Sequence, residues 1–175
     1  MSKLNPPSET FCNLPWMHIA TNASGNFRPC CNSTPGKNFI KDPETGKPYK
    51  MGKVPLDKVW NSPDYVNLRK QMLAGERPEM CSRCWKEEDA GIKSLRQSWM
   101  DTETPELNIV YADIRLGNMC NLKCRMCNPY ASNQWLDEWH LVNDPLPDDE
   151  MKRLGGETWP WYRYTQYEKN IDAFL

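Results

Sequence analysis

The sequence predicts an α/β chain, α+β overall, in which a small hairpin-plus-helix module precedes a unit made of a strand, a loop and a helix. Three observations support this prediction. Residues 16–21 have the composition of a strand, whereas the apolar residues that follow Pro63 recur at helical spacing. The eight cysteines fall into one set before residue 85 and another set after residue 119. A polar break at residues 101–106 divides the chain into modules 1–106 and 107–175.

Composition excludes several classes of protein. The 175 residues are 39% hydrophobic, which allows a modest core, and a net charge of −1 with scattered basic residues gives no surface for nucleic acid. The N-terminus lacks an apolar signal region, and no stretch approaches the roughly 20 apolar residues of a membrane span. Eight cysteines without a secretion signal indicate reduced metal ligands, so we expect a cytoplasmic protein.

The N-terminal module is expected to begin with a β-hairpin. Residues 16–21 form the first strand, the turn 22–25 contains a glycine, and residues 26–30 return. Because a hairpin brings its two ends together, Cys12 and Cys30 can reach one metal.

A polar segment at residues 32–54, rich in Pro, Gly and Lys, is expected to be an irregular surface loop. The helix after it has clear boundaries, with Ser62 as N-cap, Pro63 at the first position and Gly75 just past the end. Core residues on its face are predicted at Tyr65, Leu68 and Met72. Residues 93–100 are expected to continue a later helix, after the pair Cys81-x2-Cys84.

The second set of cysteines has the spacing C-x3-C-x2-C, at Cys120, Cys124 and Cys127. Three thiolates on one short loop can converge on a soft metal centre, and a four-iron cluster held by three cysteines keeps one iron open to a small molecule. A strand is expected at residues 107–116 and a helix at residues 128–142. The alternatives are a zinc site or three unrelated thiols, but zinc would need His140 or a distant cysteine as its fourth ligand.

This arrangement of strand, cysteine loop and helix resembles the start of a radical S-adenosylmethionine (SAM) enzyme. The resemblance implies a four-iron four-sulfur cluster whose open iron chelates SAM and whose electron splits it into methionine and a 5′-deoxyadenosyl radical. Met126 stands where the family usually has an aromatic residue against the adenine of SAM. A thioether can fill that space, so Met126 is the expected cofactor contact. An electron donor such as a flavodoxin or a ferredoxin is implied as a partner.

The N-terminal cysteines, with the helix between them, resemble the auxiliary-cluster module called SPASM, or its shorter twitch form. The resemblance makes Cys12, Cys30, Cys81 and Cys84 the ligands of a second, auxiliary four-iron cluster, with Cys31 as the spare. A zinc ribbon built from the same four thiols remains open, because spacing cannot separate zinc from iron-sulfur. Relatives with such modules often modify peptides or proteins, so a peptide or protein substrate is expected, with neither nucleic acid nor a membrane required.

The radical SAM barrel has about six strand–helix units of roughly 25–35 residues each, by analogy with other β/α repeats. Residues 107–175 can hold only its start, so an incomplete (β/α) radical SAM barrel is expected, and no catalytic side chain is assigned. Gly155, Gly156 and Glu157 match the family's SAM-binding Gly-Gly-Glu motif in composition but lack a buried strand before them. A second helix is expected at residues 167–174. The alternative function is a non-catalytic zinc or iron-sulfur module, either truncated or completed by a second chain.

Overall fold

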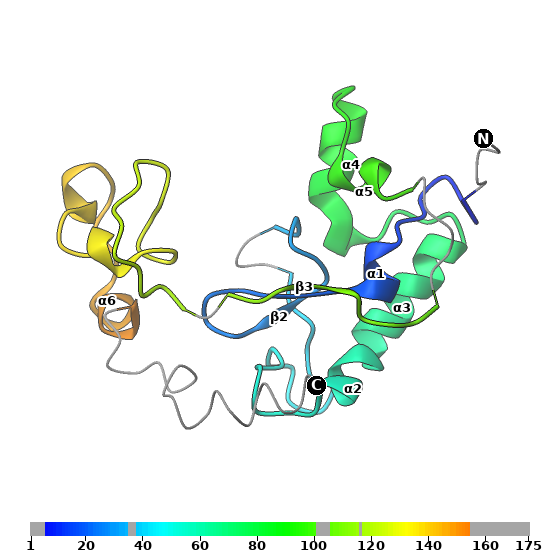
Figure 1. Cartoon of the computed structure of the whole chain (residues 1–175), viewed down its shortest axis with the longest axis horizontal. Helices are drawn as coiled ribbons and strands as arrows, with labels where there is room; N and C mark the ends of the chain where they lie inside the picture. Colours follow the sequence, from blue (N-terminus) through cyan, green and yellow to red (C-terminus); the bar gives the residue numbers. More distant parts are fainter. Residues whose placement is uncertain (1–5, 35–37, 101–105, 116, 155–175) are drawn as a thin grey trace.

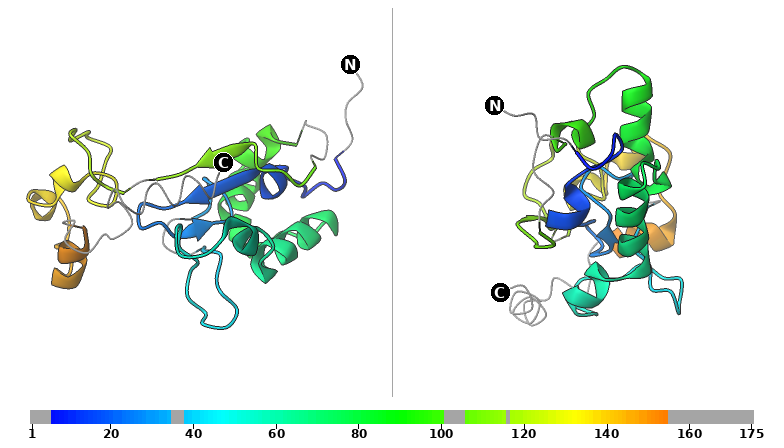
Figure 2. Two further views of the ribbon diagram at one scale, coloured as in Figure 1. Left: turned by 60° about the horizontal axis from the view of Figure 1, so that its bottom comes forward. Right: turned by 90° about the vertical axis from the view of Figure 1, so that its right-hand side faces the viewer.

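The computed structural model describes residues 6–34, 38–100, 106–115 and 117–154. A small sheet lies at the centre, the longer helices gather at one end, and residues 117–154 form a lobe at the other end (Figure 1). The left view of Figure 2 also shows this lobe apart from the helices. No helix in the described part of the chain is long and apolar enough to cross a membrane.

The N-terminal hairpin consists of β1 (His18–Thr21) and β2 (Phe27–Arg28), which pair antiparallel. Its turn is held by the side-chain oxygen of Asn22, which accepts the N–H groups of Ser24 at 3.0 Å and Asn26 at 2.9 Å. Gly25 supplies the positive φ of 75° that this turn requires. The predicted hairpin is therefore confirmed.

Both strands are shorter than predicted. The one-turn helix α1 (Leu14–Met17) occupies the expected start of β1, because Pro15 is well suited to the first turn of a helix. The return strand stops at Arg28, before Pro29, which has no N–H to donate to the ladder.

A third strand, β3 (Tyr111–Asp113), lies within the predicted strand 107–116 and pairs with β1 in parallel, which gives the order β2-β1-β3. The contact continues before the strand, where the Val110 N–H donates to the Met17 carbonyl at 2.9 Å. One sheet therefore joins the two segments of the chain across the expected boundary at residue 106.

The helical end of the molecule contains the predicted helix as α3 (Pro63–Leu73), preceded by α2 (Leu56–Trp60). Its apolar face forms core as predicted: Tyr65, Leu68 and Met72 are at most 2% exposed. Further along lie the 3-10 turn η1 (Glu79–Cys81), α4 (Ser82–Asp89) and α5 (Leu95–Ser98). The last two are separate helices, because the chain turns at Gly91 with a φ of 75° and Ser94 starts α5 with a capping box.

The described residues of the segment after the hairpin, 32–34 and 38–54, form no regular helix or strand, as predicted, but they are not simply a surface loop. Ile40, Tyr49 and Met51 are buried in the core. The Ile40 N–H donates to the Phe27 carbonyl at 3.0 Å, and the Phe27 N–H donates to the Tyr49 carbonyl at 3.0 Å. These apolar residues, spaced among many polar ones, let the segment cover β2.

The C-terminal lobe differs from the prediction. The expected helix at residues 128–142 is replaced by two 3-10 turns, η2 (Asn133–Trp135) and η3 (Trp139–Leu141). A helix needs an apolar surface to pack against, and Leu141 and Val142 are instead 69% exposed. The expected loop at residues 143–164 contains α6 (Asp148–Leu154), whose first turn carries three acidic residues that favour the helix N-terminus.

Candidate metal centre

Four cysteines from distant points of the sequence line one cavity: Cys12, Cys30, Cys81 and Cys84. The first lies just before α1 and the second two residues beyond β2, so the hairpin brings them together. The other two belong to η1 and α4, which deliver them from the helical side. The cavity measures about 20 Å³, so a cluster must push the four side chains outward as it binds.

Burial dominates the electrostatics of these thiols. It raises the pKa of Cys12 to about 12 and that of Cys30 to about 12, and the neighbouring thiol of Cys84 adds to both increases. Burial likewise raises the pKa of Cys81 well above its ordinary value, with further increases from Cys30, Cys12 and Cys84. The thiols are thus close enough to oppose one another's ionisation. With raised pKa values and no metal, the thiols of Cys12, Cys30 and Cys81 are protonated at neutral pH, so metal binding at these three residues must release protons.

Hydrogen-bond donors point at the sulfurs and favour their thiolate forms. The backbone N–H of Leu14 donates to the sulfur of Cys12, and the backbone N–H groups of Asn32 and Ser33 donate to the sulfur of Cys30. The Asn32 side-chain amide also donates to the sulfur of Cys84 at 3.5 Å. Such contacts orient metal ligands and tune the reduction potential of a cluster.

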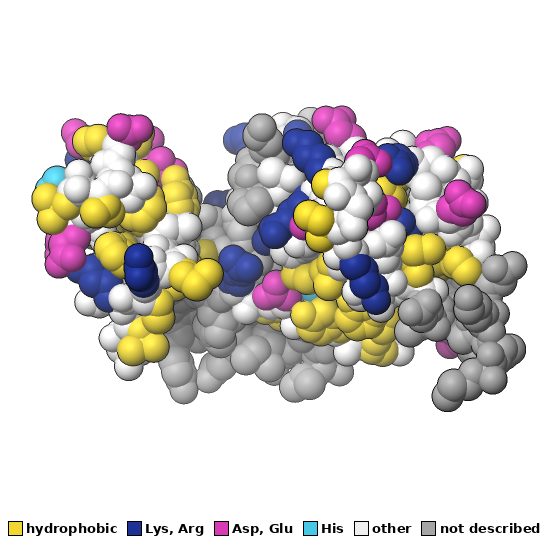
Figure 3. Space-filling model, turned by 90° about the horizontal axis from the view of Figure 1, so that it is seen from above, with side chains coloured by type: hydrophobic (Ala, Val, Ile, Leu, Met, Phe, Trp, Pro, Cys, Tyr) yellow, Lys and Arg dark blue, Asp and Glu magenta, His cyan; other side chains and the backbone are white. Residues whose placement is uncertain are grey.

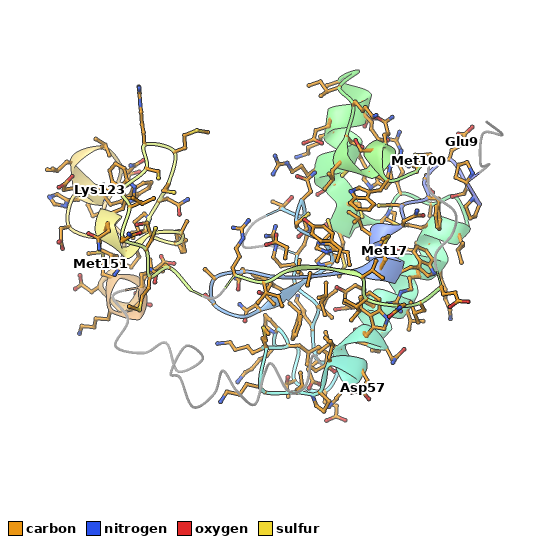
Figure 4. All side chains as sticks on the ribbon, in the orientation of Figure 1. Glu9, Met17, Asp57, Met100, Lys123 and Met151 are labelled. Carbon is orange, nitrogen blue, oxygen red and sulfur yellow. The ribbon has the colours of Figure 1, made fainter. Side chains whose placement is uncertain are left out.

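A buried cation completes this environment. Arg96 lines the cavity, and its charge lowers the pKa values of Cys12 and Cys81 against the effect of burial. Its guanidinium donates to the carbonyl of Glu9 at 2.8 Å and lies 2.9 Å from the sulfur of Met100. Figure 4 shows Glu9 and Met100 at the same end of the molecule.

The donor set fits a polynuclear cluster. Within the described ranges, no group of three or more His, Cys, Asp and Glu side chains could hold a metal ion as they stand. A single zinc ion with Zn–S bonds of about 2.3 Å needs its sulfurs about 3.8 Å apart, whereas in a four-iron cluster each cysteine binds a different iron. Four thiols from separate elements line one cavity and provide the four ligands that such a cluster needs.

Cys31 faces a different part of the molecule from Cys30. Its backbone N–H donates to Nε2 of His18 at 3.2 Å, and its thiol lies against the side chain of Tyr111. It lines a second, larger cleft that does not include the other four cysteines of the N-terminal module. The adjacent thiols therefore point to two different sites.

The cysteines of the second set, Cys120, Cys124 and Cys127, lie together on one loop of the lobe. The Cys127 N–H donates to the Cys124 carbonyl at 2.9 Å, which folds the end of this loop into a turn. Cys124 is exposed and the other two are partly exposed, so the loop presents its thiols toward the surface. Met126, the expected SAM contact, is 97% exposed, and its packing against adenine stays a prediction.

Polar contacts hold this loop in shape. The buried side chain of Asn118 donates to the carbonyls of Pro129 at 2.8 Å and Leu154 at 2.9 Å, which fixes the loop on α6. Lys123, labelled in Figure 4, pairs with Glu138 at 2.6 Å. Hydrophobic side chains are exposed over this lobe (Figure 3): Met119, Leu122, Met126, Tyr130, Leu141 and Val142.

Other predicted residues add nothing to the site. His140 is exposed and lies in η3. The motif Gly155–Glu157 and the expected helix at residues 167–174 lie outside the described residues. Asn32, Ser33 and Arg96 were not predicted from the sequence, and the polar pair directly after two cysteines is the signal that indicates N–H donors to sulfur.

Comparison with known proteins supports an iron-sulfur role for the N-terminal module. Residues 12–85 match the model of the SPASM family, described as an iron-sulfur cluster-binding domain. The match covers less than half of the chain, but it includes all four cysteines of the first cavity and supports the auxiliary module. Neither the search of curated proteins nor that of solved structures gave a match. Iron-sulfur binding is thereby indicated for this segment, and it is a property typical of radical SAM proteins.

Proposed function

We propose that this chain belongs to a radical SAM protein with two four-iron clusters. The observation that carries the proposal is the cavity lined by Cys12, Cys30, Cys81 and Cys84 within the segment that matches an iron-sulfur domain. These four thiolates hold the auxiliary cluster. Burial keeps these ligands away from water, and backbone N–H donors orient their sulfurs.

The second cluster belongs to Cys120, Cys124 and Cys127. Three ligands leave one iron open, and a bound cluster of this kind supplies the electron that cleaves SAM for hydrogen abstraction from a substrate. The residues of this chain contribute position: Asn118 holds the loop on α6, and β3, which precedes the loop, is anchored in the sheet by β1. We propose a peptide or protein as the substrate, a flavodoxin or ferredoxin as the electron donor, and the cytoplasm as the location.

A second candidate function is a non-catalytic metal module. It is favoured by the extent of the family match, which ends at residue 85 and leaves Cys120, Cys124 and Cys127 outside it. In this case only the first cavity would bind metal.

Anaerobic reconstitution with iron and sulfide distinguishes these candidates. The wild type is expected to bind about eight irons, and a variant with Ala at Cys120, Cys124 and Cys127 about four, since each cluster contains four. Cys30→Ala should lose the auxiliary cluster, while its neighbour Cys31→Ala, the matched control, should retain all eight. Zinc without labile sulfide would reject both clusters.

Cleavage of SAM is then measured on the reconstituted protein with dithionite as reductant. Formation of 5′-deoxyadenosine that disappears in the triple variant would support the enzyme. Eight irons without SAM cleavage would leave an iron-sulfur module that needs further chain to bind SAM.

A further inference from the structure

A second cleft lies between the hairpin turn and the C-terminal lobe and has a volume of about 630 Å³. The turn contributes Asn22 and Asn26, and the lobe contributes Asn128 and Tyr130. This volume is typical of sites for small molecules or for a few residues of a peptide.

The cleft has an excess of positive charge. Arg28, Arg83 and Arg115 line it, whereas Glu150 is the single carboxylate of its described lining and accepts a hydrogen bond from the Tyr130 hydroxyl at 2.6 Å. Among the described residues, neither Arg28 nor Arg115 has a carboxylate within ion-pair distance.

Arg28 is the most constrained of these cations. Its side chain is 4% exposed, and its guanidinium donates to the hydroxyl of Ser33 at 3.1 Å and to the carbonyl of the same residue. The positive charge of Arg115 is close enough to oppose that of Arg28, and the carboxylate of Asp113 only partly offsets this effect. A buried guanidinium beside a second one is stabilised when an anion binds between them.

An acceptor in the same cleft also lacks a partner. The side-chain oxygen of Asn26 is buried and receives no hydrogen bond from the described residues. A buried acceptor of this kind is costly unless a ligand or water donates to it.

We propose that this cleft binds a small ligand through an anionic group, a carboxylate or a phosphate, held by Arg28 and Arg115, with a donor of the ligand reaching Asn26. The proposal goes beyond SAM cleavage and beyond the iron-sulfur sites. Arginine suits this role because its planar fork can bind two oxygens of either anion.

Cys31 provides a reporter inside the cleft, because it is one of the lining residues. Iodoacetate and iodoacetamide both alkylate its sulfur with loss of iodide, but only iodoacetate is an anion. The ratio of the two rates cancels the reactivity of the thiol itself. It therefore measures attraction of the anion, and peptide mass spectrometry assigns the label to Cys31 whatever the state of the other cysteines.

The experiment uses the full, anaerobically reconstituted chain. Arg115→Gln is expected to lower the iodoacetate-to-iodoacetamide ratio at Cys31 by about threefold or more, because clefts of one charge concentrate counter-ions. Arg125→Gln is the matched control, since Arg125 is exposed on the cysteine loop and does not line the cleft. It should leave the ratio unchanged.

Inorganic phosphate and acetate are then added in parallel as competitors. Slower alkylation by iodoacetate in the wild type but not in Arg115→Gln supports the site, and the stronger competitor identifies which anion it prefers. Equal ratios in the wild type and Arg115→Gln, or no protection by either anion, would overturn the proposal. Absence of labile sulfide would reject the iron-sulfur function, but the ratio of alkylation rates at Cys31 would still test the anion site.

Discussion

Arg96 and Glu88 form an ion pair with Nη2 and Oε2 2.5 Å apart, and their side chains are only 5% and 9% exposed. The same guanidinium donates to the Phe11 carbonyl at 3.0 Å and lies 4.7 Å from the ring centre of Trp85. The pair thus ties α4 and α5 to the segment that carries Cys12.

Replacing Arg96 with Met should destabilise the protein by about 3–5 kcal/mol, because it leaves the carboxylate of Glu88 buried without its partner. Urea unfolding measures this change. The control is Arg77→Met, which removes an exposed pair with Asp89 and should cost about 0–1 kcal/mol. Equal effects of the two substitutions would contradict the structural role of Arg96.

The same pair predicts a dependence on pH. Burial raises the pKa of Glu88, but hydrogen bonds from Arg96 and Ser94 and the charge of Arg96 outweigh it, so the net pKa is lowered from its ordinary value of 4.5. A lowered pKa in the folded state stabilises the protein above pH 4.5, and this contribution is lost as pH falls through the folded value.

The unfolding free energies of the wild type and Glu88→Gln should therefore differ most at neutral pH and converge in acid. A difference that stays constant from neutral pH to below the ordinary pKa would show that the carboxylate charge of Glu88 contributes nothing.

Asn32 is expected to tune the auxiliary cluster. Asn32→Ala removes the amide that donates to Cys84, and a donor to sulfur favours the more electron-rich reduced state. The reduction potential should fall by roughly 20–60 mV, the one-electron equivalent of a net hydrogen bond.

Redox titration in the Cys120, Cys124 and Cys127 triple Ala background reports this cluster alone. Asn38→Ala is the control, because the Asn38 amide donates to the carbonyl of Met80 rather than to a sulfur. An equal shift in both variants would assign the effect to general loosening of the fold.

Asn118 is expected to matter for the second cluster alone. Asn118→Ala removes the hydrogen bonds that the side chain donates to the carbonyls of Pro129 and Leu154. These two carbonyls then lose this donor at a buried position. Iron bound by the Cys120 loop should decrease from about four towards zero, while the auxiliary iron is kept. Loss of both clusters together would instead indicate that the lobe supports the whole fold.

Local signals account for what the sequence predicted correctly. α3 begins at Pro63, whose fixed φ suits the first helical position, and the chain turns at Gly75, whose φ of 77° is positive. Ser62 is the N-cap residue as predicted, although its side chain makes no capping hydrogen bond. The hairpin likewise depends on the short turn at Asn22.

Features that depend on distant contacts were not predictable. The burial of Ile40 and Tyr49 depends on β2, and the predicted helix after Cys127 finds no apolar surface to pack on. The position of Arg96 beside Cys12 requires two elements that are far apart in the chain. Periodicity contains no information about such neighbours.

The parallel pairing of β1 with β3 has a consequence for how the protein forms during translation. The ribosome completes the hairpin and the five cysteines of the N-terminal module well before it makes Tyr111, which pairs with His18. Parallel contacts of such long sequence separation close slowly in an isolated chain. Since domains fold from the N-terminus as they emerge, the nascent module can offer β1 as a template for β3, and the second cysteine loop then emerges next to a strand that is already held.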